Sequence, residues 1–457
     1  MESFIEDRVP YARRIFCNRN LRLDRIQFIG FDMDYTLARY TEQIEHLQAE
    51  MVLERMVTKY GYPREVLEAT YDPGFAIRGL AVDLPNGNVF KMDRHRYVGR
   101  IWHGAGPLDR ELREKIYTNR KITPSDPRFV MVDTLFSLPE ISLYSQLVAY
   151  FDSLDETASR PTYEKLWVDL REAMDSLHRD DSLKQVIRSR LADFIIRDDE
   201  LAETLHRFRS AGKKLFLLTN SEPEYTEAVM SFLFDDLDDS YPSWRDYFEF
   251  VLTSGRKPSF FQSDEPFCAV DKPIAEVTTL RRGHLYTGGS FLELARLTGM
   301  MGEDVLYVGD HIYGDILRSK IHTHWRTAMV VQEMERELDQ VQSCRAELQE
   351  LARLEERRFQ LNLELAARAL DGDRAKKVRE EVKSLSNEIA VAERANADSF
   401  NPYWGMLFRD RTELSAFGKQ VENYACVYTS RVSNFRLYSP LWYFRSPRDR
   451  MAHELRF

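Results

Sequence analysis

The chain has 457 residues, of which 43% are hydrophobic and 12% aromatic, and its formal net charge is −10. This composition excludes a disordered chain, and the length predicts two or three lobes of ordinary domain size. The negative charge would repel nucleic acid polymers and anionic membranes, so we expect a small phosphorylated ligand held by local cations.

The cysteines and the apolar runs bear on the compartment. The four cysteines are far apart in the sequence: Cys17, Cys268, Cys344 and Cys426. No C-x-x-C redox pair and no zinc-binding spacing occurs among them, so we expect ordinary reduced thiols. The N-terminal region carries many charges, and no run of about 18 apolar residues occurs anywhere in the sequence. We therefore expect a cytoplasmic protein without a membrane segment.

The first chemical motif is FIGFDMDYTL, at residues 28–37. Its apolar start predicts a buried strand that runs directly into Asp32 and Asp34. Because residues i and i+2 of an extended segment point to the same side, both carboxylates can face one small volume. That arrangement suits a hard divalent cation, with one carboxylate as nucleophile and the other as proton carrier. A solvated acidic loop is the alternative, and the apolar strand disfavours it.

After this motif the sequence predicts a mixed helical and extended insertion. Residues 71–133 consist of short extended pieces, with a hairpin turn at residues 86–88. Helical spacing of apolar residues occurs at 43–59, 139–151, 162–177 and 183–195.

The second half returns to alternating helices and buried strands. Strands are predicted at 214–218, 248–252, 305–308 and 327–331. This alternation predicts a parallel α/β sheet, with ligands beyond the carboxyl ends of its strands.

Residues 332–396 differ in composition from the rest of the chain. They are rich in Glu, Arg, Leu and Ala, lack proline, and are broken once near residues 371–373, which predicts two long antiparallel helices. The expected apolar seam consists of Leu348, Leu351, Leu354, Val378, Val382, Leu385 and Ile389. The hairpin either carries a partner surface or packs on its own subunit. The aromatic segment that follows is expected to dock on the core.

Polar residues follow two further strands. Thr219 and Asn220 come directly after the strand at 214–218, where a hydroxyl, an amide and the next helix terminus can bind phosphate oxygens. Lys257 follows the next strand, where an ammonium group can neutralise phosphate charge. Arg256 is the alternative cation at this position.

The last motif is GDHIYGD, at residues 309–315, after the strand at 305–308. Asp310 and Asp315 add two acids at a strand end and complete an oxygen-rich site for Mg²⁺. The glycines allow the backbone to turn closely around it. His311 is expected to orient its neighbours rather than to act as a ligand.

These pieces, DMDYT, TNS, RKP and GDHIYGD, stand in the order of the haloacid dehalogenase (HAD) phosphohydrolases. Three further stretches are YDPGFAIRGL from Tyr71, TLFSLPE from Thr134 and YTGGS from Tyr286. With these stretches and the four motifs, the chain resembles the cytosolic purine 5′-nucleotidases of that superfamily, which act on IMP and GMP. The resemblance implies a Rossmann-like parallel sheet core with an inserted α+β cap and a long antiparallel helical hairpin. The implied division is a core of residues 1–42 and 200–331, a cap of 43–199, a hairpin of 332–398 and a docking segment of 399–457.

The resemblance also implies roles for single residues. Asp32 would be the nucleophile, and Asp34 would protonate the leaving oxygen and then activate water. Mg²⁺ would be held by Asp32, the backbone carbonyl of Asp34, Asp310 and Asp315, the last directly or through Lys257 or water. The implied phosphate-binding residues are Thr219, Asn220 and Lys257, and the implied base- and sugar-binding residues are Phe136, Ser137, Arg171, Asp175 and His178.

The implied activity is Mg²⁺-dependent hydrolysis of purine nucleoside 5′-monophosphates through an aspartyl-phosphate, with phosphotransfer to nucleosides, in a homodimer or homotetramer. Ser137 stands where eukaryotic members carry asparagine, which leaves the base preference open. Thr123 and Asp133 replace the arginine and asparagine of their effector site, so effector activation is also open. The alternatives are a HAD phosphatase for another small phosphomonoester and a non-catalytic assembly protein that acts through the hairpin.

Overall fold

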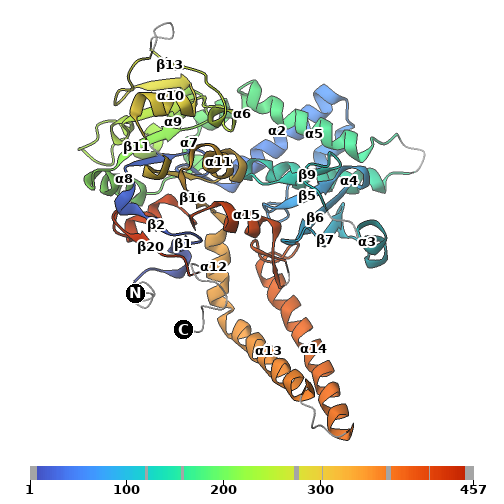
Figure 1. The fold of residues 1–457 in the computed structure, drawn as a ribbon. Helices are drawn as coiled ribbons and strands as arrows, with labels where there is room; N and C mark the ends of the chain where they lie inside the picture. Colours follow the sequence, from blue (N-terminus) through green and yellow to red (C-terminus); the bar gives the residue numbers. More distant parts are fainter. Residues whose placement is uncertain are drawn as a thin grey trace.

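The computed structural model describes residues 8–118, 122–155, 159–271, 277–300, 302–366, 372–410 and 412–447. These residues form a large sheet with helices around it, a second sheet with its own helices, and a helical hairpin that projects away from both (Figure 1). The α/β class predicted from the sequence is confirmed.

The large sheet has nine strands and carries the motifs at its centre. Its spatial order is β1 (Phe16–Cys17), β19 (Val427–Thr429), β16 (Arg326–Val330), β15 (Val305–Gly309), β3 (Phe28–Phe31), β11 (Lys214–Leu218), β12 (Phe250–Thr253), β14 (Leu285–Gly288) and β13 (Phe267–Ala269). The seven strands from β19 to β14 are parallel, and β1 and β13 are antiparallel edges. Helices around it are α8 (Glu200–Ser210), α9 (Pro223–Phe234), α10 (Phe291–Thr298), α11 (Arg318–Thr323) and α15 (Ala416–Tyr424).

The central strand β3 is buried along its whole length, between β11 and β15. Gly30 is required there, because a Cβ atom would lie 2.2 Å from a ring carbon of Phe216. Phe216 and Tyr307 instead stack with ring centroids 6.4 Å apart. This close packing fixes the strand that ends at Asp32.

The strand predicted at 248–252 begins later than expected, at Phe250. The preceding residues Trp244–Tyr247 form a 3₁₀ turn, which Ser243 and Asp246 cap reciprocally. The turn still holds the backbone of Phe248, whose N–H donates to the carbonyl of Arg245 at 3.0 Å. Strand pairing therefore starts after this turn.

The insertion after β3 contains a five-stranded antiparallel sheet and several helices. Its strands, in spatial order, are β8 (Gly106–Pro107), β7 (Val98–His103), β6 (Asn88–Met92), β5 (Leu80–Asp83) and β9 (Phe129–Val132). Its helices are α2 (Glu42–Tyr60), α3 (Arg110–Tyr117), α4 (Leu138–Ser153), α5 (Tyr163–Arg179), α6 (Ser182–Ser189) and α7 (Leu191–Phe194). The hairpin predicted at residues 86–88 is confirmed, because β5 and β6 pair antiparallel across it.

The single helix predicted at 183–195 is wrong, because the structure has two helices there. Arg190 separates α6 from α7 with a φ of −145°, which is not helical. Ile195 then leaves the helix and enters β10 (Ile195–Ile196), which pairs with β4 (Arg39–Tyr40). This two-stranded ribbon is where the chain enters and leaves the insertion.

The projecting hairpin consists of α13 (Arg345–Ala366) and α14 (Gly372–Phe400), and a shorter helix, α12 (Glu333–Ser343), precedes it (Figure 1). The two-helix prediction missed the interruption at Cys344. All seven predicted seam residues are at least half-buried, with Val378 and Ile389 the most deeply covered. Of the predicted break, residue 371 lies outside the described residues.

The C-terminal segment takes part in the main sheet rather than only docking on it. Its strand β19 pairs in parallel with β16 and antiparallel with β1. Val427 is fully buried in the main core cluster. Within the described residues, no helix is both long and apolar enough to cross a bilayer.

Candidate active site

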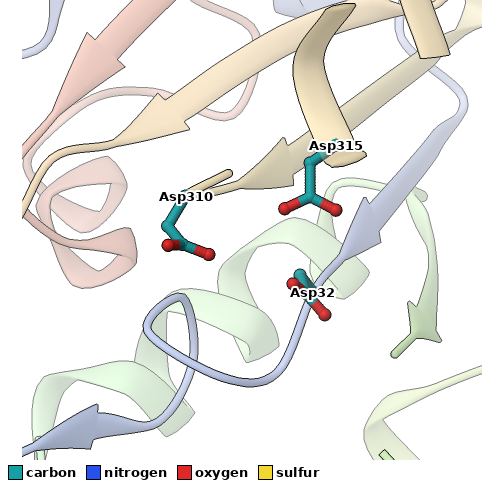
Figure 2. Close-up of side chains that lie close together, drawn as sticks. All are labelled: Asp32, Asp310 and Asp315. Carbon is teal, nitrogen blue, oxygen red and sulfur yellow. The ribbon is translucent and has the colours of Figure 1, made fainter. Parts of the chain in front are cut away.

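Three acids meet at the carboxyl edge of the large sheet. Asp32 follows β3, Asp310 follows β15, and Asp315 lies on the next turn, Ile312–Leu317 (Figure 2). One carboxylate oxygen from each lies within 4.8 Å of the other two, and all three residues are buried. Neighbouring parallel strands end at the same edge, which is why motifs far apart in the sequence meet here.

A close return of the chain after β15 brings Asp310 and Asp315 together. A Cβ atom at Gly309 would lie 2.5 Å from the Cβ of Asp315, so only glycine fits. The backbone N–H of His311 donates to Oδ2 of Asp315 at 3.2 Å, and its ring Nδ1 accepts from the N–H of Gly314 at 3.3 Å. His311 thus holds the shape of the loop.

Lys257 connects the acids on the two strands. Its Nζ lies 2.8 Å from Oδ1 of Asp32 and 2.6 Å from Oδ1 of Asp315, and it donates to the hydroxyl of Tyr307 at 2.9 Å. Burial disfavours the ammonium form, but Asp315 and Asp32 outweigh it and hold the pKa of Lys257 well above its usual value. The adjacent Arg256 points away, has a side chain that is 70% exposed and pairs with Glu265.

The acids carry more negative charge than Lys257 balances. Burial, followed by repulsion from Asp315, raises the pKa of Asp32 well above its usual value although Lys257 opposes it. The same two causes raise the pKa of Asp310 to about 7, against the attraction of Arg78. A divalent cation would relieve this repulsion and favour the ionised forms.

The donor set fits Mg²⁺. Oδ2 of Asp310 is buried and has no hydrogen-bond partner among the described residues, although its surroundings are charged. Oxygen atoms of Asp32, Asp310 and Asp315 are the hard ligands that Mg²⁺ prefers. These three residues would hold the ion.

Arg78, from the insertion, supports the backbone of Asp310. It is buried, and its Nη1 donates to the carbonyl oxygen of Asp310 at 2.7 Å. Its Nε and Nη2 donate to the carboxylate of Glu333 on α12 at 2.7 and 2.6 Å, and its guanidinium lies 5.0 Å from the ring of Phe417. Arg78 therefore ties the insertion, the metal-side loop and α12 together.

Asp34 has an environment of its own. The hydroxyl of Tyr40 donates to its Oδ1, and Ser221 Oγ donates to its Oδ2 at 2.7 Å. The hydroxyls of Tyr40 and Tyr225 lie 3.0 Å apart and extend this network. The carboxylate of Asp34 is outside the three-acid cluster, and metal contact through its backbone carbonyl stays a prediction.

Asn220 and Thr219 shape the loop beside the acids. Asn220 accepts from the N–H of Lys257 at 2.6 Å and donates to its carbonyl at 3.0 Å, so its amide clamps the Lys257 backbone. Thr219 is fully buried, and its Oγ1 accepts from the N–H of Ser221 at 3.1 Å. Direct contact of these two side chains with phosphate stays a prediction.

A cavity of about 410 Å³ extends from the acids into the insertion. Its walls include all the predicted base- and sugar-binding residues, Phe136, Ser137, Arg171, Asp175 and His178, and the acids Asp32, Asp34, Asp310 and Asp315. Asn220 and Lys257 also border it, whereas Thr219 does not. The structure thus brings nearly the whole predicted set to one cavity.

The part of the cavity wall that the insertion supplies combines an aromatic group with charged groups. The rings of Phe136 and His178 are perpendicular, with centroids 6.1 Å apart. Arg171 donates to Oε2 of Glu140 at 2.5 Å and to Oγ of Ser137 at 3.2 Å. Burial, with repulsion from Lys184, lowers the pKa of His178, so its imidazole is neutral near pH 7.

Several wall residues were not found from the sequence: Gln48, Glu140, Lys184 and Tyr225. Glu140 and Lys184 resemble ordinary polar helix residues, and only the packing of the helices brings them to the cavity. Ser221 carried a usable signal, because it belongs to the same TNS motif as Asn220.

A family model described as the 5′ nucleotidase family matches residues 15–456. The chain belongs to the 5′-nucleotidase family. It is 30% identical over 452 residues to a 5′-nucleotidase domain-containing protein of Dictyostelium discoideum, covering 97% of this chain and 75% of that protein. It is 28% identical over 463 residues to human 5′-nucleotidase domain-containing protein 2, covering 96% of this chain and 85% of that protein.

Family membership confirms the coarser part of the functional prediction, a hydrolase of phosphomonoesters. Among solved structures, the chain is similar to an archaeal β-phosphoglucomutase from Pyrococcus, with 9% identity and a TM-score of 0.32. That similarity covers 67% of this chain and 87% of the other.

Proposed function

We propose that this 5′-nucleotidase family member hydrolyses purine nucleoside 5′-monophosphates, with IMP and GMP preferred, through a phosphorylated Asp32 and with Mg²⁺ bound. One observation carries the proposal: the buried cluster of Asp32, Lys257, Asp310 and Asp315 lies at one end of a cavity of about 410 Å³. The cavity has room for a nucleotide, and Phe136 from the insertion lines its wall.

In the first step a carboxylate oxygen of Asp32 attacks the phosphorus, and the bond between phosphorus and the 5′-oxygen breaks. Asp34 gives its proton to the departing 5′-oxygen, which leaves as the nucleoside hydroxyl. Lys257 favours the ionised form of Asp32 and neutralises charge on the phosphoryl oxygens. When bound, Mg²⁺ supplies electrostatic stabilisation of the transferring phosphoryl group.

In the second step Asp34 accepts a proton from water, and the water oxygen attacks the phosphorus of the aspartyl-phosphate. The bond between phosphorus and the Asp32 oxygen breaks, which releases phosphate and regenerates the carboxylate. Tyr40 and Ser221 hold Asp34 in place through both steps, because each donates to a different carboxylate oxygen. A nucleoside that replaces water gives phosphotransfer.

Base recognition is assigned to the residues that the insertion supplies to the cavity wall. Phe136 offers a ring face for stacking on a purine. Asp175 and His178 are three residues apart on α5, so they share a helix face and can bind the edge of the base together. Arg171 and Ser137 complete this wall, and Thr219 and Asn220 are proposed to assist Lys257 at the phosphate.

The proposed domains differ in which parts of the cavity they supply. We propose residues 1–42 and 200–331 as the catalytic core, 43–199 as the cap, 332–398 as the hairpin and 399–457 as the C-terminal segment. The cap supplies Phe136, Arg171 and His178 to the cavity wall, and its proposed role is to exclude bulk water while the aspartyl-phosphate forms. A cytoplasmic location belongs to the same proposal.

We also propose a homo-oligomer, a dimer or tetramer, that uses the hairpin. Phe359 and Leu363 lie one turn apart on α13 and are exposed, as is Val391 on α14. Sedimentation of a variant with Phe359→Glu, Leu363→Glu and Val391→Glu tests this, because a monomer is expected. An unchanged oligomer would show that the hairpin does not form the subunit interface.

The test of the chemistry is detection of the phosphorylated aspartate. IMP and Mg²⁺ are mixed with the enzyme, the reaction is stopped in acid, and peptides that contain residue 32 are measured by mass spectrometry. A phosphate adduct on Asp32, absent from Asp32→Asn, is expected. Turnover without an adduct in rapid-quench samples would argue for direct attack by water.

A further inference from the structure

Gln48 is a buried amide without a partner at the wall of the cavity. It lies on α2, has no solvent-exposed surface and is one of the residues that line the cavity. Neither its Oε1 nor its Nε2 has a hydrogen-bond partner among the described residues. A buried amide in this state destabilises the fold unless a group inside the cavity hydrogen-bonds it.

The residues around Gln48 are mostly apolar. Ile44 and Val52, one turn before and one turn after it on α2, are both buried. Met174 and Ile187, from α5 and α6, border the same part of the insertion and line the cavity as well. The amide is therefore a polar group set among apolar ones, which is the usual way a pocket fixes the orientation of a ligand.

We infer that Gln48 is a specificity-determining residue that hydrogen-bonds the edge of the nucleobase, and this inference rests on the proposed function. An amide presents one donor and one acceptor side by side, as does the lactam edge of a 6-oxopurine, where a ring N–H adjoins a carbonyl oxygen. Phosphate is the poorer match, because an amide carries no charge, whereas Lys257 and the metal ligands supply the charge that a phosphate requires. The recognised class is a base with adjacent donor and acceptor atoms.

The experiment compares kcat/KM for IMP and GMP with kcat/KM for p-nitrophenyl phosphate, which has no base. In Gln48→Met the nucleotide-to-aryl ratio should fall about tenfold or more, mainly through KM for the nucleotides. In Gln48→Glu, assayed at about pH 8.5 to ionise the buried carboxyl, the side chain only accepts, so GMP, whose edge offers two N–H donors, should gain about tenfold over IMP. Gln43→Met, an exposed glutamine on the same helix, should keep the wild-type ratio.

A second measurement separates a ligand contact from a structural one. Because Gln48→Met removes an unsatisfied buried amide, the ligand-free Tm of the variant should rise, and inosine at one fixed concentration should raise Tm less for the variant than for the wild type. A fall in ligand-free Tm would show that the amide is already hydrogen-bonded in the ligand-free protein, for example by an internal water, and would overturn the inference.

The outcomes distinguish the two proposals. A wild-type enzyme that prefers p-nitrophenyl phosphate to every nucleotide would overturn the proposed function, and the base contact with it. A wild-type enzyme that prefers IMP or GMP, with an unchanged ratio in Gln48→Met, would overturn the role of Gln48 alone. If Gln48→Met does not fold, the GMP-to-IMP ratio of Gln48→Glu decides, and an unchanged ratio counts against the inference.

Discussion

Lys257 Nζ lies between the carboxylates of Asp32 and Asp315, 2.8 Å from Oδ1 of the first and 2.6 Å from Oδ1 of the second. One buried ammonium thus joins the acid after β3 to the acid after β15. Asn220 fixes the backbone of this lysine through two hydrogen bonds, so its position is set by β11 as well. The site depends on strands that are distant in sequence and adjacent in the sheet.

Removal of this ammonium should disable the nucleophile. Lys257→Met leaves the acid cluster without its buried cation, so Asp32 should be protonated more readily and the phosphoryl charge left unbalanced. We expect kcat/KM for IMP to fall by about two orders of magnitude or more. The control is Arg256→Met, which removes the adjacent, exposed cation. Equal losses in the two variants would contradict the assignment of Lys257.

Replacement of Asp34 should separate the two chemical steps. Asp34→Asn cannot protonate the 5′-oxygen, so turnover of IMP should fall by about 10²–10⁴. p-Nitrophenolate leaves without a proton, so this substrate should still phosphorylate Asp32 and give one rapid equivalent of product before hydrolysis stalls. Stopped-flow absorbance measures the burst. Tyr40→Phe, which removes one of two donors to Asp34, should show a smaller loss and no burst.

Arg78 should control metal affinity without contacting the metal. Arg78→Met removes the donor to the carbonyl of Asp310 and should weaken Mg²⁺ activation about 10–100-fold, measured as the Mg²⁺ concentration for half-maximal rate. Arg431→Met is the matched control, because Arg431 also pairs with a glutamate of α12, Glu335, whereas only Arg78 of the two donates to the carbonyl of Asp310. It should lower Tm and leave the Mg²⁺ requirement unchanged. A changed Mg²⁺ requirement in Arg431→Met but not in Arg78→Met would show that Arg78 does not support the metal site.

Glu45 should make stability depend on pH. Burial raises its pKa from 4.5 to about 7, although the hydroxyl of Tyr71 donates to its carboxylate. Between these values the folded protein keeps a proton that the unfolded chain loses, so this group's contribution to stability falls as pH rises from about 4.5 to 7. Glu45→Gln should therefore gain stability relative to wild type on going from pH 5 to pH 8, by at most about 3 kcal/mol.

Urea unfolding at the two pH values measures this difference. Glu50→Gln, an exposed glutamate on the same helix, is the control and should show the same stability change at both. A Glu45→Gln effect that is independent of pH would show that its proton is lost at an ordinary pKa.

The position of the central acids at one edge of the sheet could be predicted from the sequence, because the pattern that indicates it is local. Asp32, Asp310 and Asp315 each follow an apolar strand, and the carboxyl ends of parallel strands share one edge. The choice between Lys257 and Arg256 is different, because adjacent residues in a turn point in opposite directions and no spacing rule decides which one enters the site. The structure orients Lys257 inward and leaves Arg256 in solvent.

Residues whose role depends on distant packing were missed. Gln48 and Arg78 are polar residues that a sequence pattern assigns to the surface, yet both are buried against elements far along the chain. β19 was expected only to dock, since its strand partner β16 lies about a hundred residues earlier. The interruption at Cys344 has no strong helix breaker, so the composition predicted a continuous helix there.

The most direct measurement is phosphate release from IMP, GMP, AMP, CMP, UMP and a sugar phosphate, with and without Mg²⁺, by the wild type and Asp32→Asn. We predict that phosphate is released preferentially from IMP or GMP, that the release requires Mg²⁺, and that it disappears in Asp32→Asn. Equal or faster turnover of the sugar phosphate would contradict the purine assignment while keeping the chemistry. Full Mg²⁺-dependent activity in Asp32→Asn would contradict the central claim that Asp32 carries the phosphoryl group.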